Sequence, residues 1–184
     1  MLRAFSLALV FACFALSFTE GQEKQGVKPG GAAGLGSLRF LLGKWTGEGG
    51  GEAGQGSGYF TFEEGLQGKV LIRKNHSEYP ATKDRPAFAH DDLMIVYADA
   101  ANGPRAFYTD SEGHVINYAL SVSEGGHRVI FLSDPRDTGP RYRLTYVLTG
   151  PDTLALTFEA SPPGQPDRFG KLIEGKVRRV SGVN

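Results

Sequence analysis

The sequence is poor in cysteine and has no excess of charge of either sign. Cys13 is the only cysteine among 184 residues, and it lies in an N-terminal apolar segment. If that segment is removed, the mature domain has no disulfide, no thiolate chemistry and no cysteine-bound metal, so packing must stabilise it. The 20 basic residues balance the 20 acidic ones. This balance argues against nucleic acid or an anionic lipid surface as the main partner.

Strong catalytic motifs are also absent from the sequence. It contains no nucleophile elbow, no phosphate-cradling loop and no paired-histidine metal motif. The glycines around Gly47-Glu48-Gly49 lie in an expected strand and hairpin, so they do not form a dinucleotide fingerprint. The adjacent carboxylates Asp91-Asp92 and Glu63-Glu64 would point to opposite faces of a strand, so neither pair forms a catalytic dyad. We therefore lean towards a protein that is not an enzyme and assign no catalytic or metal-binding residues.

The N-terminus is typical of a secretory signal. Residues 1–21 combine Arg3, an apolar run to Phe18 and a polar end, with small residues at Ser17 and Gly21 after which cleavage is expected. An uncleaved membrane anchor is the alternative, but the run is short for a full span. A lipoprotein site at Cys13 is disfavoured by the apolar residues that follow it. We expect a secreted or periplasmic protein without membrane insertion, in which a flexible linker over residues 22–36 precedes a domain at 37–184.

About ten short strands separated by turn residues follow, and they indicate an all-β domain. We predict strands near residues 45–50, 59–63, 69–79, 93–98, 105–109, 114–122, 127–132, 141–148, 154–158 and 171–180. Hairpins without helical crossovers favour antiparallel pairing, and closure removes exposed edges. The prediction is an antiparallel up-and-down β-barrel. The connection Pro80–Asp91 is the expected lid or portal loop.

A short apolar turn before the first strand is expected to plug one end of this barrel. Its leucines fall near helical spacing, Ser37 could cap the turn, and Gly43 could end it in a left-handed conformation. Trp45, the only tryptophan, then starts the first strand. The first and last strands of such a barrel are neighbours, so Arg178 and Arg179 are both candidates to cover the indole face. The leucines concerned are Leu35, Leu38, Leu41 and Leu42.

Gly43-Lys44-Trp45, followed by glycine-rich strands and a C-terminal arginine, resembles the lipocalin/calycin pattern. The wider string from Leu41 to Gly49 is similar to the opening of nitrobindin-like barrels, and Asp92–Tyr118 resembles a bacterial family of lipocalin-like barrels of unknown function. The resemblance covers most of the chain after Gly34. For a nitrobindin-like protein it implies haem held by a histidine near the C-terminus. Asp167 stands about where that ligand would be, and an acidic side chain is a poor axial ligand in an apolar pocket.

The second half of the third predicted strand is polar on both faces. Either Arg73, Asn75 and Ser77 or the alternating set of Lys74, His76 and Glu78 would face the interior, where charge must be paired or solvated. Such residues would rim a water-filled opening or hold the polar head of a ligand. The alternative is that this strand simply runs past the rim into solvent. Four tyrosines are candidates to add hydroxyls to the same cavity: Tyr108, Tyr118, Tyr142 and Tyr146.

The four histidines are expected to differ in placement. His76 and His114 could face the interior, where a hydrogen-bonded core histidine is more usual than a metal or haem ligand. His90 and His127 lie beside turns and are expected in solvent. The leading hypothesis is a secreted or periplasmic barrel that binds a small, mostly apolar ligand. The alternatives are a nitrobindin-like haem protein and an envelope structural or interaction module with a filled barrel.

Overall fold

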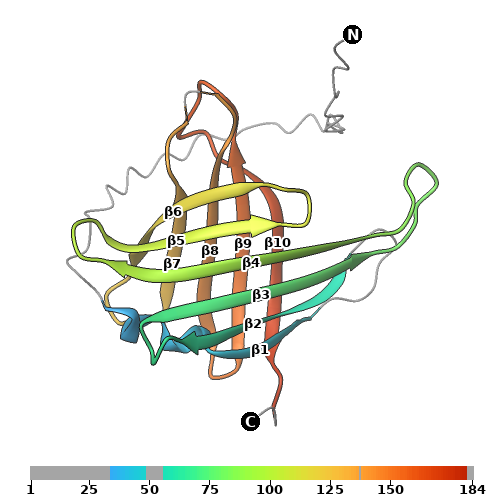
Figure 1. The fold of residues 1–184 in the computed structure, drawn as a ribbon. Coiled ribbons are helices and arrows are strands. Elements are labelled where there is room, and N and C mark those ends of the chain that lie inside the picture. Colours follow the sequence, from blue (N-terminus) through green and yellow to red (C-terminus); the bar gives the residue numbers. More distant parts are fainter. Residues whose placement is uncertain (1–33, 49–55, 137, 182–184) are drawn as a thin grey trace.

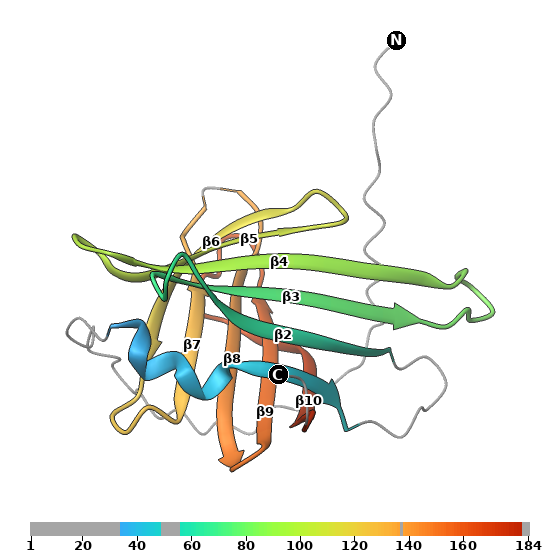
Figure 2. The same ribbon diagram turned by 60° about the horizontal axis from the view of Figure 1, so that its bottom comes forward.

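The computed structural model describes residues 34–48, 56–136 and 138–181, which form ten strands and one short 3₁₀ helix. Figures 1 and 2 show the strands wrapping into one closed barrel. The elements are η1 (Leu35–Leu41), β1 (Gly43–Gly47), β2 (Ser57–Gly65), β3 (Val70–Tyr79), β4 (Phe88–Asp99), β5 (Gly103–Asp110), β6 (Val115–Val122), β7 (Arg128–Ser133), β8 (Arg141–Gly150), β9 (Thr153–Ser161) and β10 (Gly170–Arg179).

The sheet is closed because β1 pairs with both β2 and β10. All neighbouring strands are antiparallel, and each one pairs with the next in the sequence. The predicted all-β, ten-stranded antiparallel barrel with an N-terminal helical turn is therefore confirmed. The predicted signal peptide at 1–21 and most of the linker at 22–36 lie outside the described residues, although η1 already begins at Leu35. No helix within the described ranges is long and apolar enough to span a membrane.

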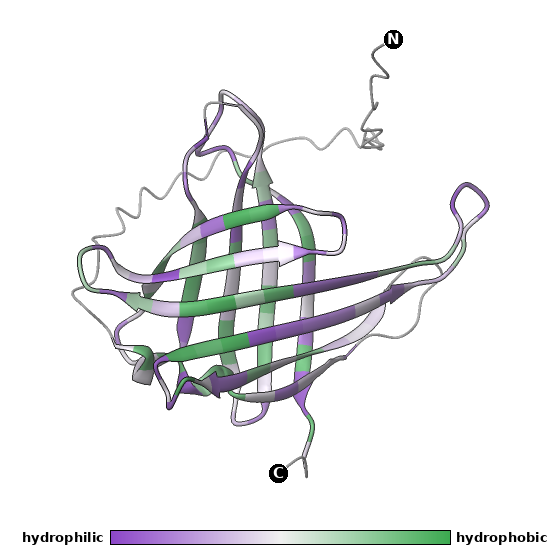
Figure 3. Cartoon of the chain, in the orientation of Figure 1, coloured by the Kyte–Doolittle hydropathy of each residue, from purple (hydrophilic) through white to green (hydrophobic). Residues whose placement is uncertain are grey.

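The predicted portal loop is partly strand, which corrects the expected boundary at Asp91. β4 begins at Phe88, opposite Tyr79, so the connection to β3 is only eight residues, 80–87. Charged residues at the start of β4 hide the alternation that identifies a strand. At the tip, the rings of Tyr79 and Phe88 stack at 4.6 Å, and Arg85 lies 4.3 Å from the Phe88 ring centroid. The hairpin projects past the body of the barrel, and the tip of its loop is hydrophilic (Figures 1 and 3).

The 3₁₀ helix closes the end of the barrel that carries the short β2–β3, β4–β5 and β6–β7 turns. Its Leu38 and Leu41 are buried, with 1% and 0% of their surface exposed. Gly43 has φ +111°, a left-handed conformation that glycine adopts without steric cost, and the chain turns there into β1. Ser37 does not cap the helix as expected. It lies inside it, and both its backbone N–H and its hydroxyl donate to the Gly34 carbonyl.

Trp45 and Arg179 join the first strand to the last. They are direct partners in the β1–β10 register, and the Arg179 guanidinium carbon lies 4.2 Å from the indole centroid. Arg178, the other candidate, points outward because side chains alternate along a strand. Its guanidinium forms a 2.5 Å ion pair with Glu48 instead.

The interior next to η1 is filled by one apolar cluster. Its largest members are aromatic rings in contact around the barrel: Phe131 and Tyr146 have centroids 6.1 Å apart, and Tyr146 and Phe60 are 5.6 Å apart. Trp45 extends this chain, with its ring 6.4 Å from Phe60. This packed half gives the barrel its core and confines any free interior space to the opposite half. The buried cluster is Leu38, Leu41, Trp45, Phe60, Phe62, Leu71, Met94, Val96, Ala106, Ile116, Tyr118, Val129, Phe131, Leu144, Tyr146, Leu154 and Val177.

Candidate functional site at the open end of the barrel

The end opposite η1 carries polar side chains on the inner face of the wall. Of the two alternating sets on β3, the one that faces inward begins with Arg73, which is 8% exposed and pairs with the buried residues Phe62 and Met94. Asn75 and Ser77 continue that face towards the rim and are half-buried, whereas Lys74 and Glu78 of the other set are exposed. The polar half of β3 thus contributes to the interior and also runs on into the projecting hairpin.

Arg73 forms a buried ion pair with Asp92 on the adjacent strand β4. The two side chains retain only 10% and 4% of their exposed surface. The guanidinium also lies 5.3 Å from the centroid of Phe60, which is part of the apolar cluster. Among the described residues, its Nε has no hydrogen-bond partner although it is buried. A buried donor without an acceptor costs about 1–3 kcal/mol, so this atom is a natural place for an added acceptor.

The four tyrosines named from the sequence all come from strands around this polar group. Tyr118 and Tyr146 are buried, whereas Tyr108 and Tyr142 are half-buried against the apolar cluster. Burial raises the pKa of Tyr118 and Tyr146, and the positive charge of Arg73 acts in the opposite direction. Their hydroxyls therefore stay protonated and can donate hydrogen bonds. Tyr142 stacks on Phe158, with ring centroids 5.6 Å apart, and adds apolar wall nearer the rim.

His90 belongs to this group, although the sequence placed it in solvent. His90 on β4 pairs with Ser77 on β3, so its side chain belongs to the inward-facing set. Its Nδ1 lies 2.7 Å from a Glu112 oxygen, and its Nε2 lies 3.4 Å from both Asp92 Oδ2 and the Tyr108 hydroxyl. The interaction with Asp92, opposed by burial and supported by Glu112, raises the pKa of His90 to about 9. The alternation His90, Asp92, Met94 would have revealed it, had β4 been predicted to start early enough.

Asp110 ends β5 directly opposite Asp92, and its side chain is 5% exposed. It accepts a 3.1 Å hydrogen bond from the Tyr108 hydroxyl and others from the backbone N–H groups of Glu112 and His114. Burial alone would raise the pKa of Asp110, but the backbone and ring of His114 lower it overall. This carboxylate, which the sequence analysis did not select, therefore stays ionised at the inner rim.

The other candidate histidines lie apart from the inner face. His76 is on the outer face of β3, where its ring packs against Tyr59 and its two nitrogens contact Asp91 at 2.8 Å and Glu78 at 3.2 Å. His114 is 55% exposed and contacts the group only through Asp110. His127 is exposed in the β6–β7 turn, as expected.

Asp167, the residue at the haem-ligand position implied by the resemblance, is on the β9–β10 connection. Its side chain is 90% exposed and lies 3.5 Å from Arg141. Asp167 is therefore directed to solvent and to an arginine, and it does not line the apolar cluster.

Hollows open on the surface formed by the described residues. One of about 300 Å³ lies between η1 and the β2–β3 turn and is lined by residues such as Arg39, Glu64 and Gln67. The other, of about 330 Å³, runs over β3, β4 and β5 near the open end and includes Asn75, Asp92 and Asp110. The second hollow includes Asp92 of the Arg73–Asp92 pair, but most of its lining, such as Lys74 and Leu93, belongs to the outward-facing set of these strands.

Comparison with known proteins gives no family assignment, since no family model and no curated protein matches the chain. The fold itself, a closed antiparallel barrel of ten strands, is compatible with the lipocalin/calycin class.

Proposed function

We propose that this protein is a binding barrel that takes a small ligand into its open end. The ligand would have an apolar body and a head that accepts hydrogen bonds. The observation that carries this proposal is Arg73, a guanidinium inside the barrel whose surroundings are aromatic and whose Nε has no acceptor in the part of the chain that the structure describes. A polar anchor at the base of an apolar wall is the usual arrangement of a small-molecule site.

The packing restricts the size of this ligand. The aromatic cluster fills the barrel from Trp45 to Tyr146, so a long chain has no room to pass through to η1. The proposed ligand would lie above Arg73, with Tyr142 and Phe158 on one side and Asn75 on the other. Because Asp92 already neutralises Arg73, the head need not be a strong anion. Carboxylates, esters and carbonyl compounds of moderate length all fit this description.

The test uses octanoate and octanol as probes, which share an apolar body and differ in the head group. Titration of the full chain, followed by the NMR signals of the tyrosine rings, should shift Tyr108 and Tyr142 and leave Tyr59 and Tyr79 on the outer face and hairpin unchanged. Binding of neither probe at millimolar concentration, together with a native mass spectrum that shows no co-purified small molecule, would overturn the proposal.

A matched pair of variants locates the binding. Tyr142→Ala removes apolar wall at the open end and is expected to weaken octanoate binding at least tenfold. Tyr59→Ala removes a ring of the same type from the outer face, where it is 42% exposed. It should leave the affinity within twofold. Equal loss in both variants would place the probe outside the barrel and contradict the proposal.

A further inference from the structure

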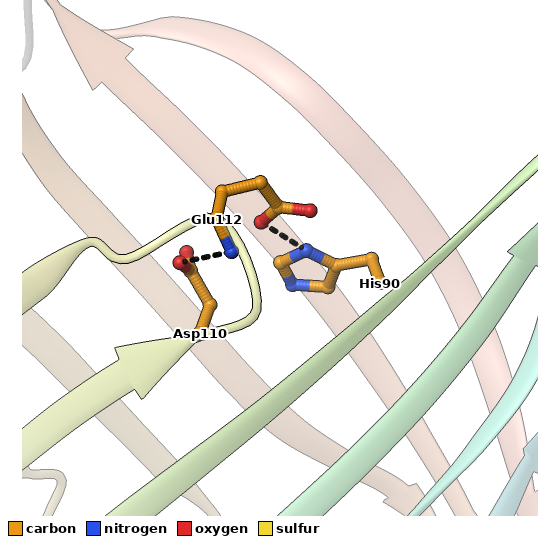
Figure 4. A group of neighbouring side chains, drawn as sticks. All are labelled: His90, Asp110 and Glu112. Atoms are coloured by element: carbon orange, nitrogen blue, oxygen red, sulfur yellow. Dashed lines mark hydrogen bonds and ion pairs between the residues drawn. The ribbon is translucent and has the colours of Figure 1, made fainter.

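We propose that His90, Asp110 and Glu112 form a binding site for a divalent transition-metal ion at the inner rim of the open end. The three residues come from β4, the last position of β5 and the turn that follows it (Figure 4). One ligand atom from each lies within 4.8 Å of the others. A shift of one to two ångströms would bring such atoms onto a common ion at about 2.0–2.2 Å.

The imidazole of His90 is held as ligating histidines are held in metal sites. A metal-bound histidine usually donates its second ring N–H to a carboxylate, which fixes its tautomer and orientation. Nε2 of His90 lies 3.4 Å from Asp92, and Asp92 is itself anchored by Arg73. A metal ion binds the neutral imidazole, so it would displace the proton that Nδ1 shares with Glu112, 2.7 Å away. Arg73 and Asp92 are thus positioning residues for the proposed ligand.

The carboxylate of Asp110 is similarly preorganised. Its oxygens accept from the Tyr108 hydroxyl at 3.1 Å and contact His114 Nδ1 at 2.9 Å. Together with the backbone N–H groups of Glu112 and His114, these contacts take up about four acceptor positions of the carboxylate, so a bound ion would displace one of them. Glu112 is 42% exposed on the turn and is free to move the short distance that closure on an ion requires. The site therefore combines two fixed ligands with one adjustable ligand.

The charges also favour a cation at this point. Three carboxylates, Asp92, Asp110 and Glu112, surround one imidazole, and two of them are 4–5% exposed. Without a metal, Arg73 and protonated His90 compensate these carboxylates, and a bound cation would replace the proton of His90. His76 on the outer face also contacts two carboxylates through opposite ring nitrogens, but within the described ranges these three residues do not bring one ligand atom each within 4.8 Å of the others.

The donor set narrows the choice of metal. Calcium and magnesium prefer oxygen ligands alone, whereas one imidazole nitrogen with two carboxylates suits zinc or manganese. Three protein ligands leave positions for water or for a polar ligand group. The sequence offers no motif for this site because the ligands are 20 and 22 positions apart and meet only through the β4–β5 register. The inference does not depend on the proposed ligand binding, since it concerns the metal alone.

The experiment is calorimetric titration of ZnCl₂ into the full chain, carried without an affinity tag and in a Cys13→Ser background so that no thiol competes. We expect one site per chain, with an affinity that falls at least tenfold in Glu112→Gln and in His90→Gln. The matched control is His76→Gln, which removes an equivalent surface histidine with two carboxylate neighbours and should change the affinity less than twofold. Glu112 is exposed, so its variant remains informative even if His90→Gln does not fold.

Co²⁺ provides a second readout, because its visible absorption reports nitrogen coordination and geometry directly. The wild-type chain should show a cobalt spectrum that disappears in Glu112→Gln and persists in His76→Gln. Three results would each overturn the inference: no Zn²⁺ binding to the wild-type chain at micromolar concentration, an unchanged affinity in Glu112→Gln, or an equal loss in His76→Gln.

Discussion

Arg179 lies over the indole of Trp45 and at the same time ties the helix η1 to the wall of the barrel. Its guanidinium donates to the carbonyls of Leu42 and Phe40 at the end of the helix and also contacts Asp152. Trp45 in turn donates from Nε1 to the Leu41 carbonyl at 2.7 Å. The last carbonyls of η1 would otherwise lack partners, so two residues from the first and the last strand complete the closed end.

Removing this arginine should therefore destabilise the whole barrel. Arg179→Ala leaves two carbonyls without a donor and exposes the indole face, and we expect a loss of about 2–4 kcal/mol in unfolding free energy. Arg178→Ala is the matched control. Its exposed ion pair with Glu48 should contribute less than about 1 kcal/mol. Urea unfolding followed by tryptophan fluorescence measures both. Equal effects would show that the contact with Trp45 has no special role.

The buried pair of Arg73 and Asp92 leads to a second prediction. Removing either partner alone leaves the other charge buried, and we expect Asp92→Leu or Arg73→Met to cost about 3–5 kcal/mol each. The double variant should recover much of this loss, because no unpaired charge then remains. Unfolding free energies of the four proteins form a double-mutant cycle. Simple additivity of the two losses would contradict the pairing seen in the structure.

The pH dependence of stability should report the environment of His90. Its pKa is about 9 in the folded protein, chiefly through Asp92, and about 6.5 in an unfolded chain. Because the folded pKa is the higher one, the stabilisation is complete below pH 6.5 and is lost as pH rises through 9. It amounts to about 3 kcal/mol at most.

This titration is measured on metal-free protein, in the presence of a chelator. Unfolding free energies of the wild type and of His90→Gln are compared between pH 6 and pH 10. The difference between them should shrink as pH rises. A constant difference across this range would show that His90 does not gain a proton-dependent interaction on folding.

The strands and the barrel were predictable because alternation and turn residues are local signals. The plug was predictable for the same reason, since Gly43 ends it as expected. It was harder to predict which side chains of a strand face the barrel interior, because a shift of one residue exchanges the two faces of a strand. The sequence could not choose between Arg178 and Arg179, or between the sets headed by Arg73 and Lys74. The structure decides both choices, because Trp45 and Phe62 are buried and their partners on the neighbouring strands face the interior with them.

The polar group at the rim was only partly predictable. Arg73 and the tyrosines were found because a charge or a hydroxyl in an alternating strand is visible in the sequence. Asp110 and Glu112 were not selected from the sequence, because they belong to a turn. His90, which precedes a pair of aspartates, was expected in solvent. Charged residues at a strand end look like solvent-exposed loop, and the β4–β5 register brings them together at the inner rim.

A close backbone approach next to this rim gives the last prediction. A side-chain carbon at Gly58 would lie 2.3 Å from the backbone oxygen of His76, on the partner strand, which cannot move without breaking the β2–β3 ladder. We expect Gly58→Ala to cost about 1–3 kcal/mol and to loosen the open end. Gly47→Ala is the control, because nothing lies within 4 Å of a carbon added there.

Both substitutions reduce the freedom of the unfolded chain equally, which by itself would stabilise the protein by about 0.4–1 kcal/mol. Their difference therefore isolates the close contact. Thermal unfolding should give a lower midpoint for Gly58→Ala than for the wild type and an equal or higher one for Gly47→Ala. Amide hydrogen exchange should accelerate at Ser77 in the first variant alone. If Gly58→Ala were as stable as Gly47→Ala, β2 and β3 would have to be farther apart at the rim than the structure places them.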